Sequence, residues 1–221
     1  MSLAALVQCS DGRKYVIKRC DLGRPLCAEH VVGRLGLLIG APCMEVALAD
    51  VTPQLIALDP KLQRFAGGLA HATVNIDNVA EHRGVQHQAI PQNRPRFASL
   101  LVLYSWMCAA DHQFMYEVAS PHLVYSHDHG CFFHGAQAWT PATLAAGVAA
   151  ALDGPLSAIG LSNAEIKAAA VPLAAVTDAE IAQVLAPIPA PWGVPSADML
   201  ALGQYLRQRR DAILAIIGGL P

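Results

Sequence analysis

The order of the secondary-structure signals constrains the fold of this chain most strongly, since strand signals dominate its first part and helix signals the remainder. Two apolar stretches, 3–9 and 14–20, flank a Ser-Asp-Gly turn signal and predict a β-hairpin. Two more strands are expected at 44–51 and 54–58. Strands that precede helices in this way are typical of an α+β fold, and we expect two lobes with a cleft between them.

Helix signals begin inside the strand-rich part and then take over. One helix is expected at 24–39, where a glycine and a proline follow the last apolar residue, and a core helix is expected at 96–110. The intervening segment 60–94 carries no regular pattern and is expected to be irregular. Four helices are expected in the last part of the chain, and the first three begin with Ser or Thr. They span 140–152, 162–171, 177–185 and 196–217.

The remaining segments set the expected division of the chain. Residues 111–122 are predicted to form a loop, and 123–128 and 131–134 short strands. We therefore expect an N-lobe at 1–62, with strands and one helix, and a largely helical C-lobe at 63–221. The two lobes together would form one domain.

One face of the helix expected at 24–39 combines a single acid with small residues. They recur at helical spacing and are Glu29, Gly33, Gly36 and Gly40. A glycine inside a helix costs roughly 1 kcal/mol against alanine. We therefore expect these glycines to allow another part of the chain to pack closely along the line of the glutamate.

Composition excludes several classes of protein. The sequence is 54% hydrophobic and 14% charged, which indicates a folded chain with a sizeable core. A net charge of -2 lacks the positive footprint of general nucleic-acid binders, so no nucleic-acid partner is expected. The best membrane candidate, 97–110, is shorter than the roughly 20 residues that a spanning helix needs, so no membrane span is expected.

The cysteines and the first residues indicate the compartment. The cysteines are scattered without any C-x-x-C pair, which favours reduced thiols over a disulfide framework or a zinc knuckle. The first residues have no basic segment before their apolar stretch, so no signal peptide is expected. We therefore expect a soluble, cytoplasmic protein. The cysteines are Cys9, Cys20, Cys27, Cys43, Cys108 and Cys131.

Two aspartates in similar contexts are the strongest candidates for chemistry. Asp111 follows the apolar run at 97–110, and Asp128 lies between two strand-like stretches. In phosphoryl-transfer enzymes, one such aspartate orients or deprotonates the attacking hydroxyl, and a second holds the metal bound to the nucleotide phosphates. Taken alone, the pair fits two turn aspartates equally well.

A lysine and a glutamate upstream strengthen this hypothesis. Lys18 lies in the strand-like stretch YVIKRC, and Glu29 lies eleven positions later in the expected helix. In kinases a strand lysine contacts the nucleotide phosphates, and a helix glutamate keeps its flexible side chain oriented. For the lysine and glutamate alone, an exposed strand lysine and a first-turn glutamate favoured by the helix dipole are the simpler interpretation. Joined in order with the two aspartates, they favour a phosphoryl-transfer site.

Histidines crowd around Asp128 and open a different possibility. An H-x-H pattern along a strand points both rings to the same face, where they could bind zinc with His112 or Asp111 as a further ligand. Ordinary polar or half-buried histidines are the simpler interpretation. The histidines concerned are His122, His127, His129 and His134.

Arginines and aromatic residues elsewhere are assigned structural roles. Trp106 and Phe114 are expected in the core. A cluster of arginines near the end of the chain is expected on the solvent-exposed face of the last helix. They are Arg207, Arg209 and Arg210.

With these residues in this order, the sequence resembles the HipA-like kinase family, small bacterial kinases related in fold to phosphoinositide kinases. The resemblance covers about residues 12–133 and implies a two-lobed, protein-kinase-like α+β fold. The stretches that carry it are DGRKYVIK, AEHVVGRLGLLIGAP, YSWMCAADHQ and HLVYSHDHGCFF, with FAGG at 65–68 where the family has an FGS-like segment.

The resemblance also implies a reaction, in which the γ-phosphoryl group of ATP passes to a hydroxyl with the help of Mg²⁺. Lys18 would contact ATP, with Glu29 as its partner. Asp111 would be the catalytic aspartate and Asp128 the Mg²⁺-binding one. The acceptor, a protein or a small molecule, is not identified by these motifs.

The chain departs from the family pattern beside the catalytic aspartate. The family usually has Arg next and Asn five positions on, where this chain has His112 and Tyr116. Tyrosine cannot replace an amide oxygen as a metal ligand at the same reach, although Glu117 is adjacent. The alternatives are therefore a weakly active kinase, a pseudokinase that binds a nucleotide or a partner, and a His/Asp metal hydrolase.

Overall fold

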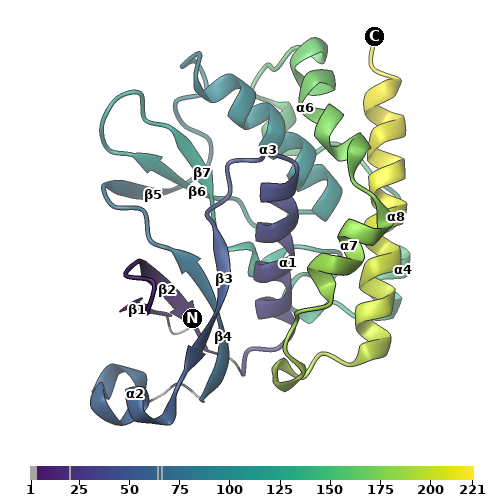
Figure 1. Cartoon of the computed structure of the whole chain (residues 1–221). Helices are drawn as coiled ribbons and strands as arrows, with labels where there is room; N and C mark the ends of the chain where they lie inside the picture. The colour runs from purple at the N-terminus through teal and green to yellow at the C-terminus, as the bar shows by residue number, and fades with distance from the viewer. Residues whose placement is uncertain (1–3, 20, 64, 66) are drawn as a thin grey trace.

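Strands and helices occupy separate parts of the molecule. The computed structural model describes residues 4–19, 21–63, 65 and 67–221. Within these residues, two antiparallel sheets lie on one side and most of the helices pack along the other (Figure 1). This arrangement confirms the predicted α+β class.

The first sheet runs in the order β1-β2-β4-β3. Its strands are β1 (Ala4–Gln8), β2 (Lys14–Lys18), β3 (Val46–Val51) and β4 (Gly68–Val74). β1 and β2 form the predicted hairpin, with Ala4 opposite Lys18, while Leu3 and Cys20 at its predicted ends lie outside the described residues. β4 lies in the segment expected to be irregular and beyond the expected lobe boundary at residue 62. Pairing with β2 and β3 on either side makes it a strand.

The second sheet runs in the order β5-β6-β7. Its strands are β5 (Val79–Arg83), β6 (Gln113–Glu117) and β7 (Val124–Ser126). The prediction of a loop at 111–122 is therefore wrong for β6, which has a partner strand on each side. The strand predicted at 131–134 is also wrong, because Asp128 adopts a left-handed conformation and starts a 3-10 turn at His129–Cys131.

A helix replaces the strand predicted at 54–58. α2 (Pro53–Leu58) begins with a Thr-Pro pair. The Thr52 side chain accepts a hydrogen bond from the Leu55 backbone at 3.2 Å, and Pro53 occupies the first helical position. Both are helix-start signals that local apolar content does not reveal.

The other helices follow the predictions more closely, except α5 (Gly154–Ser157), which lies outside the predicted helices. They are α1 (Arg24–Leu38), α3 (Asn93–Met107), α4 (Pro141–Ala146), α5 (Gly154–Ser157), α6 (Asn163–Ala175), α7 (Asp178–Leu185) and α8 (Ser196–Gly218). α6 and α7 begin after Ser162 and Thr177, where the sequence predicted helix starts, and both residues form capping boxes with the glutamates three positions on. In the described part of the chain, no single helix is long and apolar enough to cross a membrane, and α6 and α7 pass that test only as a pair bent by 75°.

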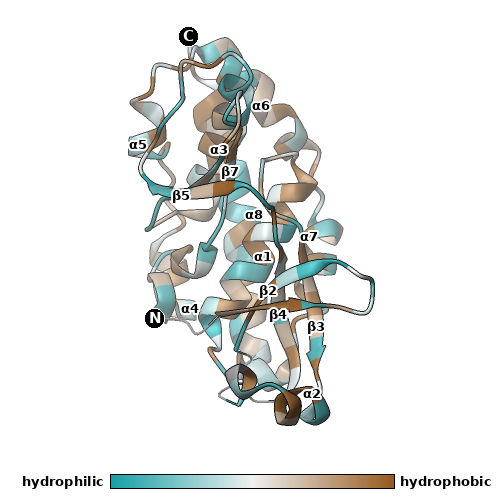
Figure 2. Cartoon of the chain, turned by 90° about the vertical axis from the view of Figure 1, so that its left-hand side faces the viewer, coloured by the Kyte–Doolittle hydropathy of each residue, from teal (hydrophilic) through white to brown (hydrophobic). Residues whose placement is uncertain are grey.

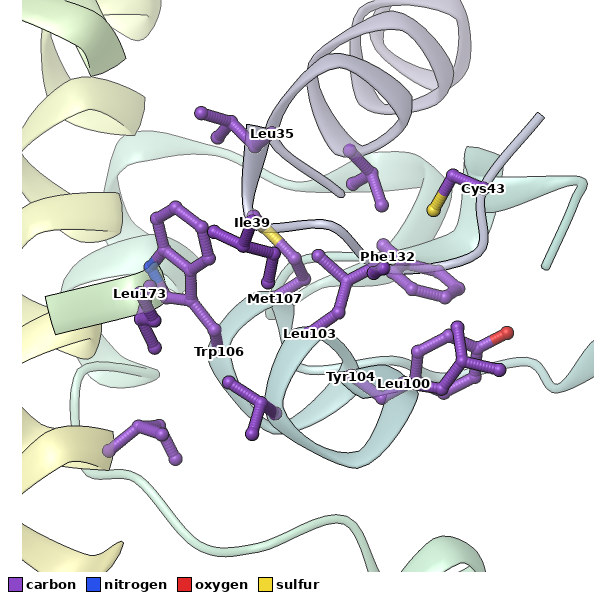
Figure 3. Packing of buried hydrophobic residues seen from close by; sticks show 14 of the residues in the cluster. Leu35, Ile39, Cys43, Leu100, Leu103, Tyr104, Trp106, Met107, Phe132 and Leu173 are labelled. Atoms are coloured by element: carbon purple, nitrogen blue, oxygen red, sulfur yellow. The ribbon is translucent and has the colours of Figure 1, made fainter. Parts of the chain in front are cut away.

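The main hydrophobic core joins α1 to α3, α6 and α8, so the helix of the first part packs into the second part. Leu35 of α1 and Ile39, the residue just after α1, meet Leu103 and Trp106 of α3 in this core (Figure 3). Phe114 is buried there too, so both predicted core aromatics are confirmed. A smaller core lies under the first sheet, and α2 carries apolar residues at the far end of that sheet (Figure 2).

Gly33 and Gly36 allow this close packing, as predicted, whereas the prediction is wrong at Gly40, which lies beyond α1 with open space around it. A Cβ atom on Gly33 would lie 2.7 Å from a methyl carbon of Val46 in β3. A Cβ atom on Gly36 would lie 2.5 Å from the sulfur of Cys43. Both contacts are far below van der Waals distance, so α1 approaches the following chain only where no side chain intervenes.

The arginine prediction is wrong at Arg209, which is buried in α8 rather than exposed. Its guanidinium donates to the carbonyls of Ser105 and Trp106 at the end of α3. It also donates to the carbonyls of Gly147 and Ala149. The helix predicted at 140–152 ends early, at Ala146 with Gly147 as its C-cap, and Arg209 bonds carbonyls just beyond that end.

Candidate active site

The site lies where the first sheet, α1 and the second sheet meet. Lys18, the last residue of β2, points its ammonium group between two carboxylates. It donates one hydrogen bond to Oε1 of Glu29 and another, 2.7 Å long, to Oδ1 of Asp128. Elements far apart in the chain thus meet at one cation.

Glu29 is held on two sides. It lies on the buried face of α1, and its second oxygen, Oε2, accepts a hydrogen bond from the His129 backbone at 3.0 Å. Gly130 allows this approach, since a Cβ atom there would stand 3.3 Å from Oε1 of Glu29. Burial raises the pKa of Glu29 to about 7, against the opposing effect of the Lys18 charge.

The pKa of Asp128 is shifted in the direction opposite to that of Glu29. Burial alone would raise its pKa, but hydrogen bonding with Glu29 and the Lys18 charge outweigh burial and hold the pKa well below its usual value. Its side chain remains 39% exposed, whereas that of Glu29 is 5% exposed. Asp128 is therefore an ionised carboxylate that is still accessible to a ligand.

Asp111 lies in the short connection between α3 and β6. Its Oδ1 accepts a hydrogen bond from the His112 backbone at 3.0 Å, and its Oδ2 accepts one from the Gln113 side chain at 2.7 Å. The His112 ring contacts Asp153 instead, with 2.8 Å between Nε2 and Oδ2. The two donors fix the orientation of the Asp111 carboxylate.

Cavities open on both sides of the lysine. One, of about 260 Å³, has largely apolar walls from both sheets, including Val16, Val74 and Met115. Another, of about 390 Å³, is lined by Asp111 and by the start of α1. A larger cavity of about 540 Å³ lies between α7 and α8 and touches none of the site residues. The residues that line both of the first two cavities are Lys18, Glu29, Gln113 and Asp128.

Tyr116, where the family usually has its asparagine, lies elsewhere. It is buried in β6, its hydroxyl accepts a hydrogen bond from the Gln86 backbone at 2.9 Å, and it donates to the Gly84 carbonyl. Among the described lining residues of the two cavities, neither Tyr116 nor Glu117 occurs.

Gln113, which lines both cavities, was not among the site residues predicted from the sequence. The overlooked signal was the alternation in QFMYE, which predicts a strand with Gln113 and Met115 on the face opposite Phe114.

Two weaker sequence candidates do not join the site. Phe65 belongs to the small core of the first sheet, Ala66 lies outside the described residues, and the cavity walls as described include no residue of 65–68. Histidines do not assemble a zinc site either. In the part of the chain that the structure describes, no three His, Cys, Asp or Glu side chains form a group that could hold a metal ion.

The sequence was compared with models of known protein families, and one model matches the part of the chain that supplies these site residues. The family model for HipA-like kinases matches residues 1–133, which is more than half of the chain and includes Lys18, Glu29, Asp111 and Asp128. The chain belongs to the HipA-like kinase family. Searches of curated proteins and of solved structures returned no match.

Membership of the HipA-like kinase family indicates the general function of the chain and agrees with its fold. A kinase-like function follows, and the two sheets with their helices agree with the α+β fold that the sequence predicted. In this HipA-like kinase, Lys18 and Glu29 come from β2 and α1, whereas Asp111 and Asp128 come from the segments that precede β6 and follow β7. The fold brings all of them to the walls of one cavity.

Proposed function

We propose that this HipA-like kinase transfers the γ-phosphoryl group of ATP to a hydroxyl acceptor. The observation that carries the proposal is the position of Lys18 and Asp128 on the shared wall of the two cavities. The cavity with apolar walls suits a nucleotide base, and the cavity that contains Asp111 suits the acceptor. The phosphate chain would then pass the lysine and the aspartate.

Lys18 and Glu29 would hold the phosphates. A lysine side chain is flexible, and a buried glutamate that accepts a hydrogen bond from its ammonium group keeps it oriented. The pKa of Lys18 lies above its ordinary value, because the two carboxylates outweigh the lowering effect of burial. The lysine is therefore charged when phosphates arrive.

Asp128 would hold Mg²⁺, and the residues present fit this ion. Mg²⁺ in phosphoryl-transfer sites is usually bound by one or two protein oxygens together with the phosphates. Asp128 offers an ionised, accessible carboxylate at the cavity wall. When bound, the ion would neutralise charge on the phosphate oxygens.

Asp111 would orient the acceptor hydroxyl and take its proton. Its carboxylate is fixed by two donors and lies on the wall of the second cavity, the side from which an acceptor would approach. Fixed groups of this kind supply most of the rate in phosphoryl transfer, since the protein chiefly positions the reactants and stabilises charge.

The test measures binding and transfer separately. Calorimetry with ATP and Mg²⁺ reports binding, and radiolabelled ATP reports transfer to the protein itself or to water. We expect Asp111→Asn to retain binding and lose transfer by a factor of about 100 or more. Binding without transfer, unchanged in Asp111→Asn, would instead identify a pseudokinase that acts as a binding module. Absence of binding would refute both functions.

A further inference from the structure

Gln113 occupies the junction of the proposed site and is almost fully buried. It is the first residue of β6, is 9% exposed, and lines both cavities beside Lys18 and Asp128. Polar side chains with so little exposure normally have a partner for each polar group. Its hydrogen bonds therefore show which of its groups is free to bind a ligand.

The hydrogen bond to Asp111 fixes how the amide is turned. A carboxylate only accepts, so the group 2.7 Å from Oδ2 of Asp111 is the NH₂ of Gln113. The carbonyl oxygen of the amide then points the other way. Among the residues that the structure describes, none donates a hydrogen bond to this oxygen.

Strand pairing places Gln113 near the proposed metal ligand. β6 and β7 pair with Phe114 opposite Ser126, and the next pair along the strands sets Gln113 opposite His127. The His127 backbone donates to the Gln113 backbone carbonyl at 3.4 Å, which continues this register. Residues opposite each other on paired strands have Cβ atoms about 5 Å apart and face the same side. Asp128 follows His127 directly and lines the same two cavities as Gln113.

The chemistry of this oxygen suits Mg²⁺. Hard divalent cations prefer carboxylate and amide oxygens, and kinases pair an aspartate with an amide side chain for this purpose. We propose that the side-chain amide oxygen of Gln113 is a second protein ligand of the Mg²⁺ ion held by Asp128. This inference rests on the proposed function. The ligand then lies two positions after Asp111, on the cleft face of β6, whereas Tyr116 lies on the core face. The same amide ties the acceptor-orienting carboxylate to the metal.

The test measures metal binding rather than activity. Mn²⁺ replaces Mg²⁺, and electron paramagnetic resonance reports free Mn²⁺ as it is titrated into the protein with a non-hydrolysable ATP analogue. We expect Gln113→Leu to weaken Mn²⁺ binding about tenfold or more, while binding of the metal-free analogue is unchanged. Gln113→Glu keeps an oxygen at the same reach and should retain Mn²⁺ binding, although it loses the hydrogen bond to Asp111.

Matched controls separate this role from a structural one. Tyr116→Phe, at the position where the family usually has asparagine, should leave Mn²⁺ affinity unchanged. Gln183→Leu makes the same substitution at an exposed position and should also have no effect. If Gln113→Leu does not fold, Gln113→Asn carries the test, because it keeps the amide but shortens its reach and should weaken Mn²⁺ binding.

The outcomes distinguish this inference from the proposed function. A wild-type chain that binds neither Mn²⁺ nor the analogue would overturn both. Wild-type affinity in a folded Gln113→Leu or Gln113→Asn variant would overturn the role of Gln113 alone. Equal losses in Gln113→Leu and Gln113→Glu would also overturn it, since they would show that the residue only positions Asp111.

Discussion

The Lys18 ammonium lies 2.7 Å from the Asp128 carboxylate, although 110 residues separate the two in the chain. The same ammonium contacts Glu29, so one cation joins β2, α1 and the turn after β7. A nucleotide that bound here would exchange part of this ion pair for its own phosphates and metal. Lys18, Glu29 and Asp128 therefore stabilise the contact between these elements and also form the centre of the proposed site.

Removing the cation should destabilise the fold. Lys18→Met leaves Glu29 and Asp128 facing each other without a counter-charge, and breaking a largely buried ion pair from one side costs about 3 kcal/mol. We expect the free energy of unfolding in urea to fall by about that amount. Adding Glu29→Gln to the same chain should recover part of the loss. Equal stability of wild type and Lys18→Met would contradict this account.

The buried arginine should matter far more than its exposed neighbour. Arg209→Leu leaves several buried carbonyls without a donor, so we expect a loss of about 3 kcal/mol in the free energy of unfolding. Arg207, whose side chain is 42% exposed, pairs with Asp178 at the surface, so Arg207→Leu should change the free energy of unfolding by less than ~1 kcal/mol. Urea unfolding of both variants checks the contrast, and similar losses would refute it.

Replacing a helix glycine by alanine should have opposite effects on stability at Gly36 and at Gly218, because their surroundings differ. Gly36→Ala forces a methyl group against the Cys43 sulfur, and we expect a loss of about 1–3 kcal/mol in unfolding free energy. Gly218, in the last turn of α8, has open space around it. Gly218→Ala should leave stability unchanged or raise it by up to ~1 kcal/mol. Thermal unfolding of the two variants measures the difference, and a stabilised Gly36→Ala protein would disprove the close-packing role.

Acid should destabilise the protein through a buried histidine pair. His30 of α1 and His71 of β4 meet edge to face, with ring centroids 5.8 Å apart. Burial lowers the pKa of His30 from 6.5 to about 4, and burial also lowers the pKa of His71. The unfolded chain therefore binds more protons than the folded one between these values, and stability falls as the pH drops from about 6.5 to about 4.

The same linkage between proton binding and folding gives the size of the expected loss of stability and the way to measure it. At pH 5 the loss of stability that His30 causes is about 2 kcal/mol, since each pKa unit corresponds to about 1.4 kcal/mol. We expect His30→Phe to flatten the decline when unfolding free energy is measured in urea from about pH 7.5 to about pH 4.5. An identical slope in wild type and variant would exclude His30 as a source of the acid sensitivity.

Local signals predicted those parts of the fold that depend on neighbours in the chain. The hairpin of β1 and β2 follows from its turn, and α6 and α7 begin where their capping boxes place them. Interactions within a few residues decide such elements, so the sequence is sufficient. Local signals also predicted correctly that Lys18 lies on a strand and Glu29 on the helix that follows.

Distant contacts decided β4, β6 and the burial of Arg209, whereas α2 begins at local signals, the Thr52 cap and Pro53. β4 and β6 each lie between two other strands, and one partner of each, β2 for β4 and β5 for β6, lies far away in the chain. Arg209 resembled an exposed helix residue until the carbonyls at the end of α3 surrounded it. Local composition does not report such contacts.

The sequence by itself determined the family and the chemical groups of the candidate site, because motifs carry residue types and their order. Only the tertiary structure decided which side chains share the cavity wall. A shift of one residue on a strand turns a side chain to the opposite face, so the register of β6 against β7 sets Gln113 toward Asp128 and Tyr116 into the core. The alternation in QFMYE puts Gln113 and Tyr116 on opposite faces of β6, but only the packing of the second sheet decides which of these faces lines the cavity.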